Sequence, residues 1–177
     1  MHAPFVLTII GPDRRGIVES LSDVIAAHDG NWLESRMARL AGQFAGLLSI
    51  TLPAERAGDL EHALAELETE GLRIILQAGD RAAPQPAHVL RLELVGHDRP
   101  GIVRDIARTL RPQYINVEEL TSESYSAPMS GELLFKATLE LGIPAESHMD
   151  DITRTLDQLA EQLSLDLSYD ETPPRQR

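Results

Sequence analysis

Two short segments of the chain combine glycine, aspartate and arginine at the same spacing, and their chemistry suits a small zwitterionic ligand. Residues 11–18 read GPDRRGIV and residues 96–103 read GHDRPGIV. A glycine-containing turn that leads into a helix leaves backbone N–H groups unpaired at the positive end of the helix dipole, where a carboxylate can bind. The aspartate of each turn can accept hydrogen bonds from an ammonium group, and an asparagine beyond each helix can both donate and accept.

These groups define one set of candidate ligand-binding residues in each segment. They are Gly11, Asp13, Gly16, Ile17 and Asn31 in the first, and Gly96, Asp98, Gly101, Ile102 and Asn116 in the second. The alternative is a structural role, in which the aspartate caps the helix, the glycine lets helix and strand pack closely, and the asparagine takes a left-handed turn. The residues favour the structural role in the first segment and leave the choice open in the second.

No other arrangement of residues in the sequence is typical of catalysis or metal binding. The chain has 6 histidines without an H-E-x-x-H spacing, and it has 0 cysteines. It contains neither a nucleophile elbow of the G-x-S-x-G type nor a P-loop. We therefore expect no catalytic residues, no metal site and no cofactor, and we expect that the protein is not an enzyme.

The two segments lie in the two copies of a tandem duplication. Their matching positions, from the first glycine to the asparagine, share an offset of 85 residues. Residues 53–55 and 144–146 both read PAE at an offset of 91, so the second copy carries about six extra residues. The two copies fill the 177 residues and leave no room for a separate catalytic domain.

Hydrophobic periodicity predicts the same order of elements in each copy. In the first copy, strands are expected over residues 5–10, 32–40, 44–52 and 72–76, with a hairpin turn at 41–43. The apolar face of its first helix consists of Ile17, Leu21, Val24 and Ile25, and that of its second helix of Leu60, Leu64 and Leu67. In the second, strands are expected over residues 89–95, 117–124, 133–139 and 165–167, and the helices carry Ile102, Ile106 and Leu110, then Ile152, Leu156, Leu159 and Leu163.

This order predicts an α+β fold of two tandem ferredoxin-like (βαββαβ) domains, each an antiparallel sheet with helices on one face. We expect the first domain over residues 1–79 and the second over residues 89–170. Residues 80–88 contain two prolines and are expected to form a stiff linker, and residues 171–177 a disordered tail.

The charge of the chain argues against direct contact with nucleic acid. Its 16 basic and 28 acidic side chains give a net charge of −12, and residues 1–80 and 81–177 each carry −6. Affinity for DNA grows with the number of phosphates that a protein neutralises, so neither half is suited to bind it.

No apolar run reaches the roughly 18 residues that span a bilayer, and the N-terminus lacks a basic signal. We expect a cytoplasmic protein with no membrane partner.

The motif, the element order and the duplication together resemble the ACT domain, a small-molecule sensing module of amino-acid metabolism. Two such units with little else, and the segment NWLESRM at residues 31–37, resemble the glycine cleavage system transcriptional repressor family. The second copy carries the DRPG of the ACT pattern at residues 98–101, whereas Arg15 stands where the first copy would have proline. The resemblance implies ligands in the region of these turns, usually at an interface between two units.

The resemblance also implies a function. It predicts a regulatory amino-acid-sensing protein whose ligand is glycine or a similar small amino acid. Such a protein would act through a regulatory partner such as a DNA-binding activator, without direct DNA binding. The alternative is a ligand-free interaction module, or an accessory regulatory subunit of an amino-acid metabolic enzyme.

One predicted helix carries a stripe of arginines that could take part in assembly. Arg104, Arg108 and Arg111 stand at i, i+4 and i+7 on one face. The counterparts of the first two in the other copy are Glu19 and Asp23, so the unlike helices could attract each other within a chain or between chains. By the family topology the second and fourth strands of each copy lie at sheet edges, which need charge or a pairing partner. We therefore expect a homodimer rather than a monomer.

Overall fold

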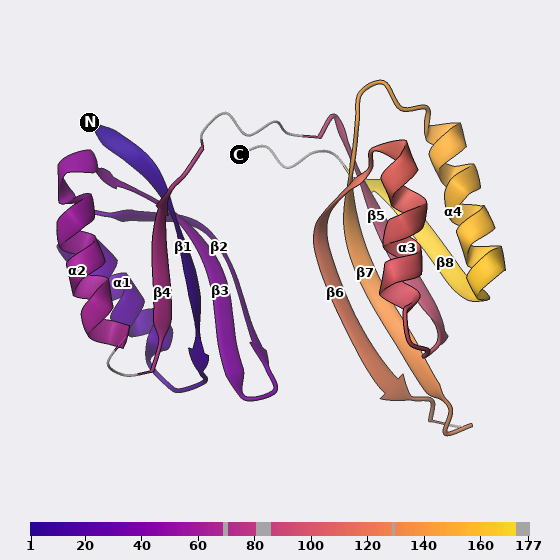
Figure 1. Ribbon diagram of the computed structural model, residues 1–177, viewed down its shortest axis with the longest axis horizontal. Coiled ribbons are helices and arrows are strands. Elements are labelled where there is room, and N and C mark those ends of the chain that lie inside the picture. Colours follow the sequence, from indigo (N-terminus) through magenta and orange to yellow (C-terminus); the bar gives the residue numbers. More distant parts are fainter. Residues whose placement is uncertain (69–70, 81–85, 129, 173–177) are drawn as a thin grey trace. The chain divides into compact units, whose positions relative to one another are not determined.

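In the computed structural model, each half of the chain forms a four-stranded antiparallel sheet with two helices on one of its faces (Figure 1). The structure describes residues 1–68, 71–80, 86–128 and 130–172. The chain divides into two units, Met1–Ala83 and Pro84–Arg177. The prediction of two tandem ferredoxin-like domains is confirmed.

The first unit follows the order β-α-β-β-α-β. Its strands are β1 (His2–Pro12), β2 (Asn31–Leu40), β3 (Gln43–Pro53) and β4 (Arg73–Ala78), and its helices are α1 (Ile17–Ala27) and α2 (Ala57–Glu68), with a short 3-10 helix η1 (Ala54–Arg56) before α2. The strands lie in the order β2-β3-β1-β4. β2 and β4 therefore form the edges of the sheet, as predicted.

The second unit repeats this order and topology. Its strands are β5 (His88–His97), β6 (Asn116–Ser126), β7 (Leu133–Ile143) and β8 (Leu165–Thr172), and its helices are α3 (Ile102–Leu110) and α4 (Met149–Leu163), with a 3-10 helix η2 (Arg111–Gln113) after α3. The strand order is β6-β7-β5-β8, with β6 and β8 at the edges.

Two predicted boundaries of the second unit were wrong by one or two residues. Glu171 and Thr172, assigned to a disordered tail, pair with Leu90 and Val89 and lengthen β8. His88, assigned to the linker, begins β5. Backbone pairing with a neighbouring strand extends each strand beyond its apolar run, which a hydrophobic pattern does not report. Residues 81–85 of the predicted linker and residues 173–177 of the tail lie outside the described residues.

Each unit has its own hydrophobic core between the sheet and its helices. Strand alternation directs every second side chain of β3 under the helices, and Leu48, Ile50 and Leu52 are fully buried there. Helix α1 buries residues 17, 21 and 25, one per turn, in the same cluster. In the second unit α3 buries residues 102, 106 and 110 in the same way. Within each unit, neither of the described helices covers the opposite face of its sheet (Figure 1).

The connection between β2 and β3 confirms the predicted hairpin. Leu40 pairs with Gln43, and only two residues lie between them. Ala41 and Gly42 have φ angles of 49° and 80°. Positive φ at both central residues is the mark of a type I′ turn, whose twist matches that of the strands it joins. Gln43, expected in the turn, is a strand residue.

The close approach of β1 to the segment before β4 predicts that Gly11→Ala destabilises the first unit. A Cβ at Gly11 would lie 2.7 Å from the carbonyl oxygen of Gly71 and 3.0 Å from the Cα of Leu72. Both contacts are backbone atoms, so the sheet itself must shift. We expect the free energy of unfolding to fall by about 1–3 kcal/mol, measured by urea unfolding followed by circular dichroism.

Gly58→Ala is the matched control for this change. Gly58 lies in α2, and a Cβ there would meet nothing within 4 Å. Alanine is the better helix former, so this variant should be more stable by roughly 0.5–1 kcal/mol. A Gly11→Ala protein as stable as the wild type would contradict the steric argument.

Candidate functional site

Each of the two candidate turns connects the first strand of a unit to its first helix through a left-handed glycine. Gly16 precedes α1 with φ 86°, and Gly101 precedes α3 with φ 90°. A residue with a side chain is strained at such a φ, so glycine is the residue that fits this position. No side chain caps either helix. The prediction that Asp13 or Asp98 caps its helix was wrong, because the glycine is the N-cap and the aspartate lies three residues before it.

The first glycine of each turn allows the first and last strands of its unit to approach closely. The structural alternative, in which the glycine lets a helix and a strand pack together, does not describe it. Gly11 lies against the backbone just before β4. Gly96 lies against Leu165, the first residue of β8, and a Cβ there would also lie 3.3 Å from the carbonyl oxygen of Ser164. These glycines therefore shape the scaffold that holds the turn.

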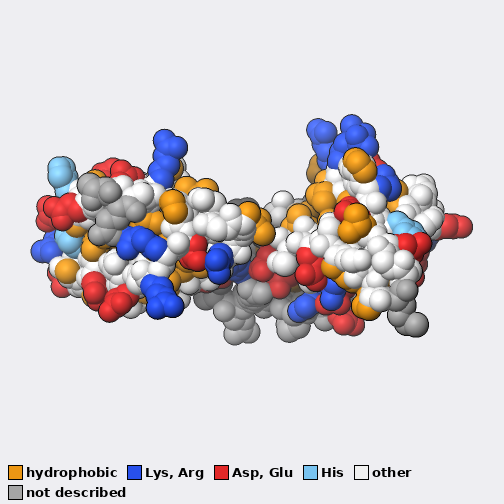
Figure 2. Space-filling view, turned by 90° about the horizontal axis from the view of Figure 1, so that it is seen from below, with side chains coloured by type: hydrophobic (Ala, Val, Ile, Leu, Met, Phe, Trp, Pro, Cys, Tyr) orange, Lys and Arg blue, Asp and Glu red, His pale blue; other side chains and the backbone are white. Residues whose placement is uncertain are grey.

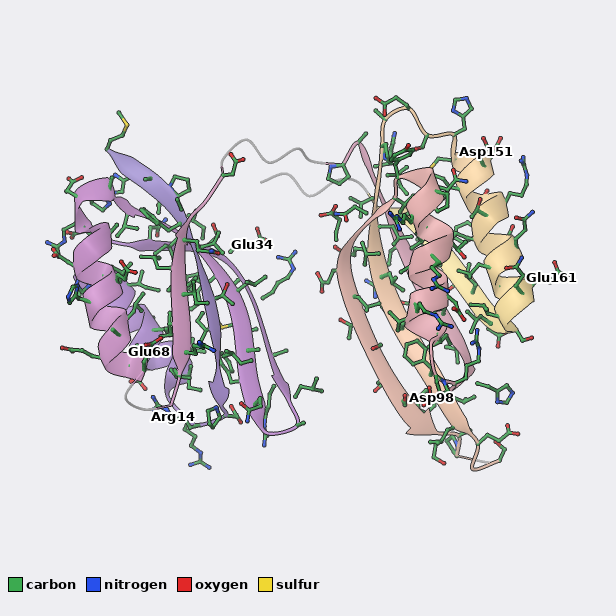
Figure 3. All side chains as sticks on the ribbon, viewed as in Figure 1. Arg14, Glu34, Glu68, Asp98, Asp151 and Glu161 are labelled. Carbon is green, nitrogen blue, oxygen red and sulfur yellow. The ribbon has the colours of Figure 1, made fainter. Side chains whose placement is uncertain are left out.

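The two turns have the same backbone pairing but differ in the state of the aspartate. The N–H of Asp13 donates to the carbonyl of Gly42, and that of Asp98 donates to the carbonyl of Leu133, both at 2.9 Å. The carboxylate of Asp13 also pairs with Arg39, with Oδ2 to Nε at 2.8 Å. The exposed carboxylate of Asp98 makes no hydrogen bond or ion pair with any residue that the structure describes (Figure 3). Only the second turn leaves its carboxylate available to an ammonium group.

The isoleucine of each motif belongs to the core. Ile17 is 2% exposed and Ile102 is 4% exposed. Their side chains anchor the first turn of the helix beneath the sheet and cannot contact a ligand at the surface. What these two residues can offer a ligand is the backbone N–H, at the positive end of the helix.

The asparagines begin β2 and β6 and do not take left-handed turns. Positive φ angles occur two residues earlier, at Asp29 (59°) and Tyr114 (56°). The alternative that gave this role to Asn31 and Asn116 was therefore wrong. Each chain reversal is completed before the asparagine, which already pairs in the sheet with Thr51 or Gly142.

The aspartate and the asparagine of one unit lie at opposite ends of its sheet. Along β7, Leu133 contacts Asp98, whereas Gly142 pairs with Asn116. Nine residues of extended strand separate these two points, which corresponds to about 30 Å. The first unit has the same arrangement along β3. One unit alone therefore cannot hold a small amino acid between both side chains.

Asn116 lies beside a shallow hollow that the sequence analysis did not identify. Its Nδ2 donates to Glu118 Oε1 at 2.8 Å. The hollow has a volume of about 380 Å³ and is lined by Ala107, Leu110, Arg111, Tyr114, Ile115, Asn116 and Val117. Tyr114 is 86% exposed. An aromatic residue between the end of a helix and a strand was the available signal for this feature.

The second turn also carries a compact ion cluster that was not predicted. Asp105 Oδ2 lies 3.0 Å from a terminal nitrogen of Arg99, and its Oδ1 lies 3.0 Å from a terminal nitrogen of Arg104. Hydrogen bonds from Arg104 and then from Arg99 lower the pKa of Asp105 below its ordinary value. Ser20 occupies the equivalent position of the first unit. Two guanidinium groups against one carboxylate leave a net positive charge at the start of α3.

Arg104 and Arg108 are exposed on α3, whereas Arg111, predicted on the same helix, is an exposed residue of η2. In Figure 2 a group of Lys or Arg side chains projects from the second unit. Arg104 pairs with its own neighbour Asp105, with Nε to Oδ1 at 3.1 Å. The attraction of Arg104 and Arg108 to Glu19 and Asp23 remains a prediction.

The described ranges contain neither a cluster of metal ligands nor a membrane-spanning helix. No group of three histidine or acidic side chains there could hold a metal ion. No helix in the same part of the chain has the length and apolar character needed to cross a bilayer.

Comparison with known proteins agrees with this geometry. Residues 3–76 match the family model of the ACT domain. The second unit has the same element order and sheet topology. The first unit therefore matches the ACT domain, and the second unit shares its fold.

Two solved structures resemble the chain over nearly its whole length. An unknown protein from Galdieria sulphuraria is 27% identical with a TM-score of 0.84, and the match covers 97% of this chain and 99% of that one. A protein provisionally described as a glycine cleavage system transcriptional repressor is 16% identical with a TM-score of 0.71, covering 98% and 99%. The second likeness shows a shared fold. A search of curated proteins finds no match.

The ion cluster predicts a pH-dependent contribution to stability from Asp105. Because its pKa is lowered on folding, the contribution is complete above the ordinary aspartate pKa of about 3.9 and is lost as pH falls through the lowered value. Urea unfolding should show wild type more stable than Asp105→Asn at pH 7, with the difference shrinking as the pH falls below the ordinary aspartate pKa. Asp98→Asn is the control, since it removes one carboxylate of the same turn that makes no ion pair with any described residue. A gap between wild type and Asp105→Asn that does not change with pH would contradict the charge assignment.

Proposed function

We propose that this protein is a regulatory amino-acid sensor of the glycine cleavage system transcriptional repressor type, located in the cytoplasm and acting through a partner protein. The observation that carries the proposal is the free carboxylate of Asp98 beside the uncapped start of α3. This turn offers a carboxylate to the ammonium group of a zwitterion and backbone N–H groups to its carboxylate. No catalytic role is proposed for any residue.

The second turn supplies a group for each charged end of a free amino acid. The α-carboxylate binds the backbone N–H groups that follow Gly101, where the helix dipole and the cluster of Arg99 and Arg104 add positive potential. The ammonium group binds Asp98. The first turn binds more weakly, because Arg39 already occupies the carboxylate of Asp13.

Asn116 can join such a site only when it comes from another ACT domain. The length of the sheet separates it from Asp98 of its own unit. A homodimer offers a second copy of the asparagine, and in that arrangement the amino acid itself links two chains. Binding would then change the association of chains, which is how a sensing domain transmits its state to a partner.

Glycine or a similarly small amino acid is the proposed ligand. Support comes from the resemblance of the segment at residues 31–37 and of the duplicated architecture to the glycine cleavage repressor family. The partner proposed is a regulatory protein such as a DNA-binding activator. The net charge of −12 argues that any contact with DNA is made by that partner.

A ligand-free role is the second candidate, and one observation favours it. The Asn116 amide is already bonded to Glu118, so half of the proposed binding set is satisfied within its own unit. The chain would then be an interaction module or an accessory regulatory subunit of an amino-acid metabolic enzyme. Direct measurement of amino-acid binding separates the two candidates.

Binding to the second turn predicts that free glycine, or another small amino acid, raises the melting temperature of the purified protein. The free energy of unfolding should rise with the logarithm of the amino-acid concentration, by about 2.7 kcal/mol at 100 times Kd. Asp98→Ala should abolish binding in titration calorimetry while circular dichroism stays unchanged, and Asp13→Ala should bind almost as wild type does. If none of the twenty amino acids shifts the melting temperature, the ligand-free role is favoured. Binding retained by Asp98→Ala would remove this residue from the site.

The charge of the chain predicts that the protein alone does not retard DNA in a gel at physiological salt. With a net charge of −6 in each of residues 1–80 and 81–177, neither part can neutralise enough phosphates to bind. The assay uses duplex DNA of mixed sequence at two salt concentrations. A shift that weakens with added salt would contradict the partner-dependent mechanism.

A further inference from the structure

The helix-free face of the first sheet carries a patch of exposed aliphatic side chains. Ile10, Leu47 and Ile75 are 47%, 53% and 48% exposed. They lie on β1, β3 and β4, which are adjacent in the sheet. Their chain neighbours Ile9 and Leu48 are buried under the helices, so alternation directs the exposed residues to the opposite face.

Strand register makes this patch continuous. Thr8 on β1 pairs with Leu47 on one side and with Ile75 on the other. Val6 and Ile10 flank Thr8 on the same face, each two residues away along β1. We define the apolar face by residues 6, 8, 10, 45, 47 and 75.

The second sheet shows that the fold does not require an apolar surface at this position. On its helix-free face Glu93 stands where Thr8 stands in the first, and it pairs with Thr138 and Ser168. Those two residues take the places of Leu47 and Ile75. Charged residues dominate the rest of that face: Arg91, Glu119, Glu123, Lys136, Glu140, Asp166 and Asp170. An aliphatic patch on the first sheet alone therefore indicates a function of the first unit.

We propose that the apolar face packs against the same face of a second copy of the chain. A two-fold interface uses one surface twice, so aliphatic side chains meet aliphatic side chains and lose water together. A strongly acidic surface would be a poor occupant, because its carboxylates would lose hydration against Ile10, Leu47 and Ile75. The proposal gives the homodimer of the proposed function a surface, and it does not depend on amino-acid binding.

Charges at the corners of the face fit this two-fold arrangement. Glu34 on β2 lies opposite Ser49 at one corner and forms an ion pair with Arg36, which lies opposite Leu47 on the same strand. Arg73 on β4 lies opposite Ile10 at the diagonally opposite corner. The four strands span about 14 Å between the outer strand axes, and the four-residue step along them is about 13 Å. The face is thus nearly square. A two-fold axis along the other diagonal places Glu34 of one protomer against Arg73 of its partner, with the sheets packed orthogonally.

The size of the face sets the strength of the expected dimer. Four strands at about 4.8 Å and five residues at about 3.3 Å give a footprint of roughly 300 Å² per copy. That is smaller than a standard specific interface, so we expect association to be weak and reversible. We expect a dissociation constant of about 1–100 μM.

Leu47→Glu tests the proposal, and Val18→Glu is its matched control. Leu47 is 53% exposed, so a glutamate there remains hydrated in the monomer but would be buried in the dimer. Val18 is 48% exposed on α1, on the helix side of the sheet. The mass of each protein is measured by light scattering from about 1 to 100 μM without amino acid, and circular dichroism confirms that each variant is folded.

The expected result is a wild-type mass that rises from 19.5 kDa toward twice that value with concentration. Val18→Glu should follow the wild type, and Leu47→Glu should stay at 19.5 kDa. Arg73→Glu should weaken the dimer, and adding Glu34→Arg should restore part of it. A wild type that stays monomeric, or a Leu47→Glu protein that dimerises as wild type does, overturns the proposal. Amino-acid binding is measured separately by calorimetry, so its absence in a protein that dimerises would count against the proposed function alone.

Discussion

Burial of one face of each sheet beneath two helices is the interaction on which the other features of this chain depend. Strand side chains alternate between two faces and helix side chains repeat every 3.6 residues, so a helix can cover only one face of the sheet. Ile17, Leu21 and Ile25 meet that face in the first unit, and their counterparts do so in the second. This packing places the start of α1 or α3 at the end of the preceding strand, and it leaves the opposite face of the sheet to other uses.

The duplication has kept the scaffold and changed the surfaces. Both units retain the glycine that lets two strands approach and the left-handed glycine before the helix. The side chains around these positions differ. Asp13 forms an ion pair with Arg39, whereas Asp98 pairs with no described side chain and is next in sequence to Arg99 of the Asp105 cluster. The helix-free faces differ as strongly. Aliphatic side chains occupy the centre of the first, with Glu34, Arg36 and Arg73 toward its edges, whereas charged residues dominate the second. Because the core of each unit is independent of both surfaces, the two could acquire separate roles, ligand recognition and assembly, without a cost to folding.

Charge and packing act together at the second turn. Positive potential from the helix dipole and two guanidinium groups lies within one turn of helix, and a single unpaired carboxylate stands before it. The isoleucine side chain of the motif does not take part in this chemistry, because it is held in the core. In the proposed function, a site made of backbone N–H groups and one carboxylate would bind the α-carboxylate and ammonium groups that all amino acids share, and neighbouring surfaces would select the side chain.

The sequence by itself determined the repeat, the order of elements and the core residues. These follow from periodicity and from local turn chemistry, which act over a few residues: residues 102, 106 and 110 must share a helix face, and Ala41-Gly42 must turn. Only the tertiary structure decided which side chains come together. Asp98 and Asn116 lie 18 positions apart in the chain, yet the length of β7 separates them. Likewise, the pairing of Asp13 with Arg39 and the continuity of Leu47, Thr8 and Ile75 depend on strand register, which arises when distant segments pair and which no local pattern encodes.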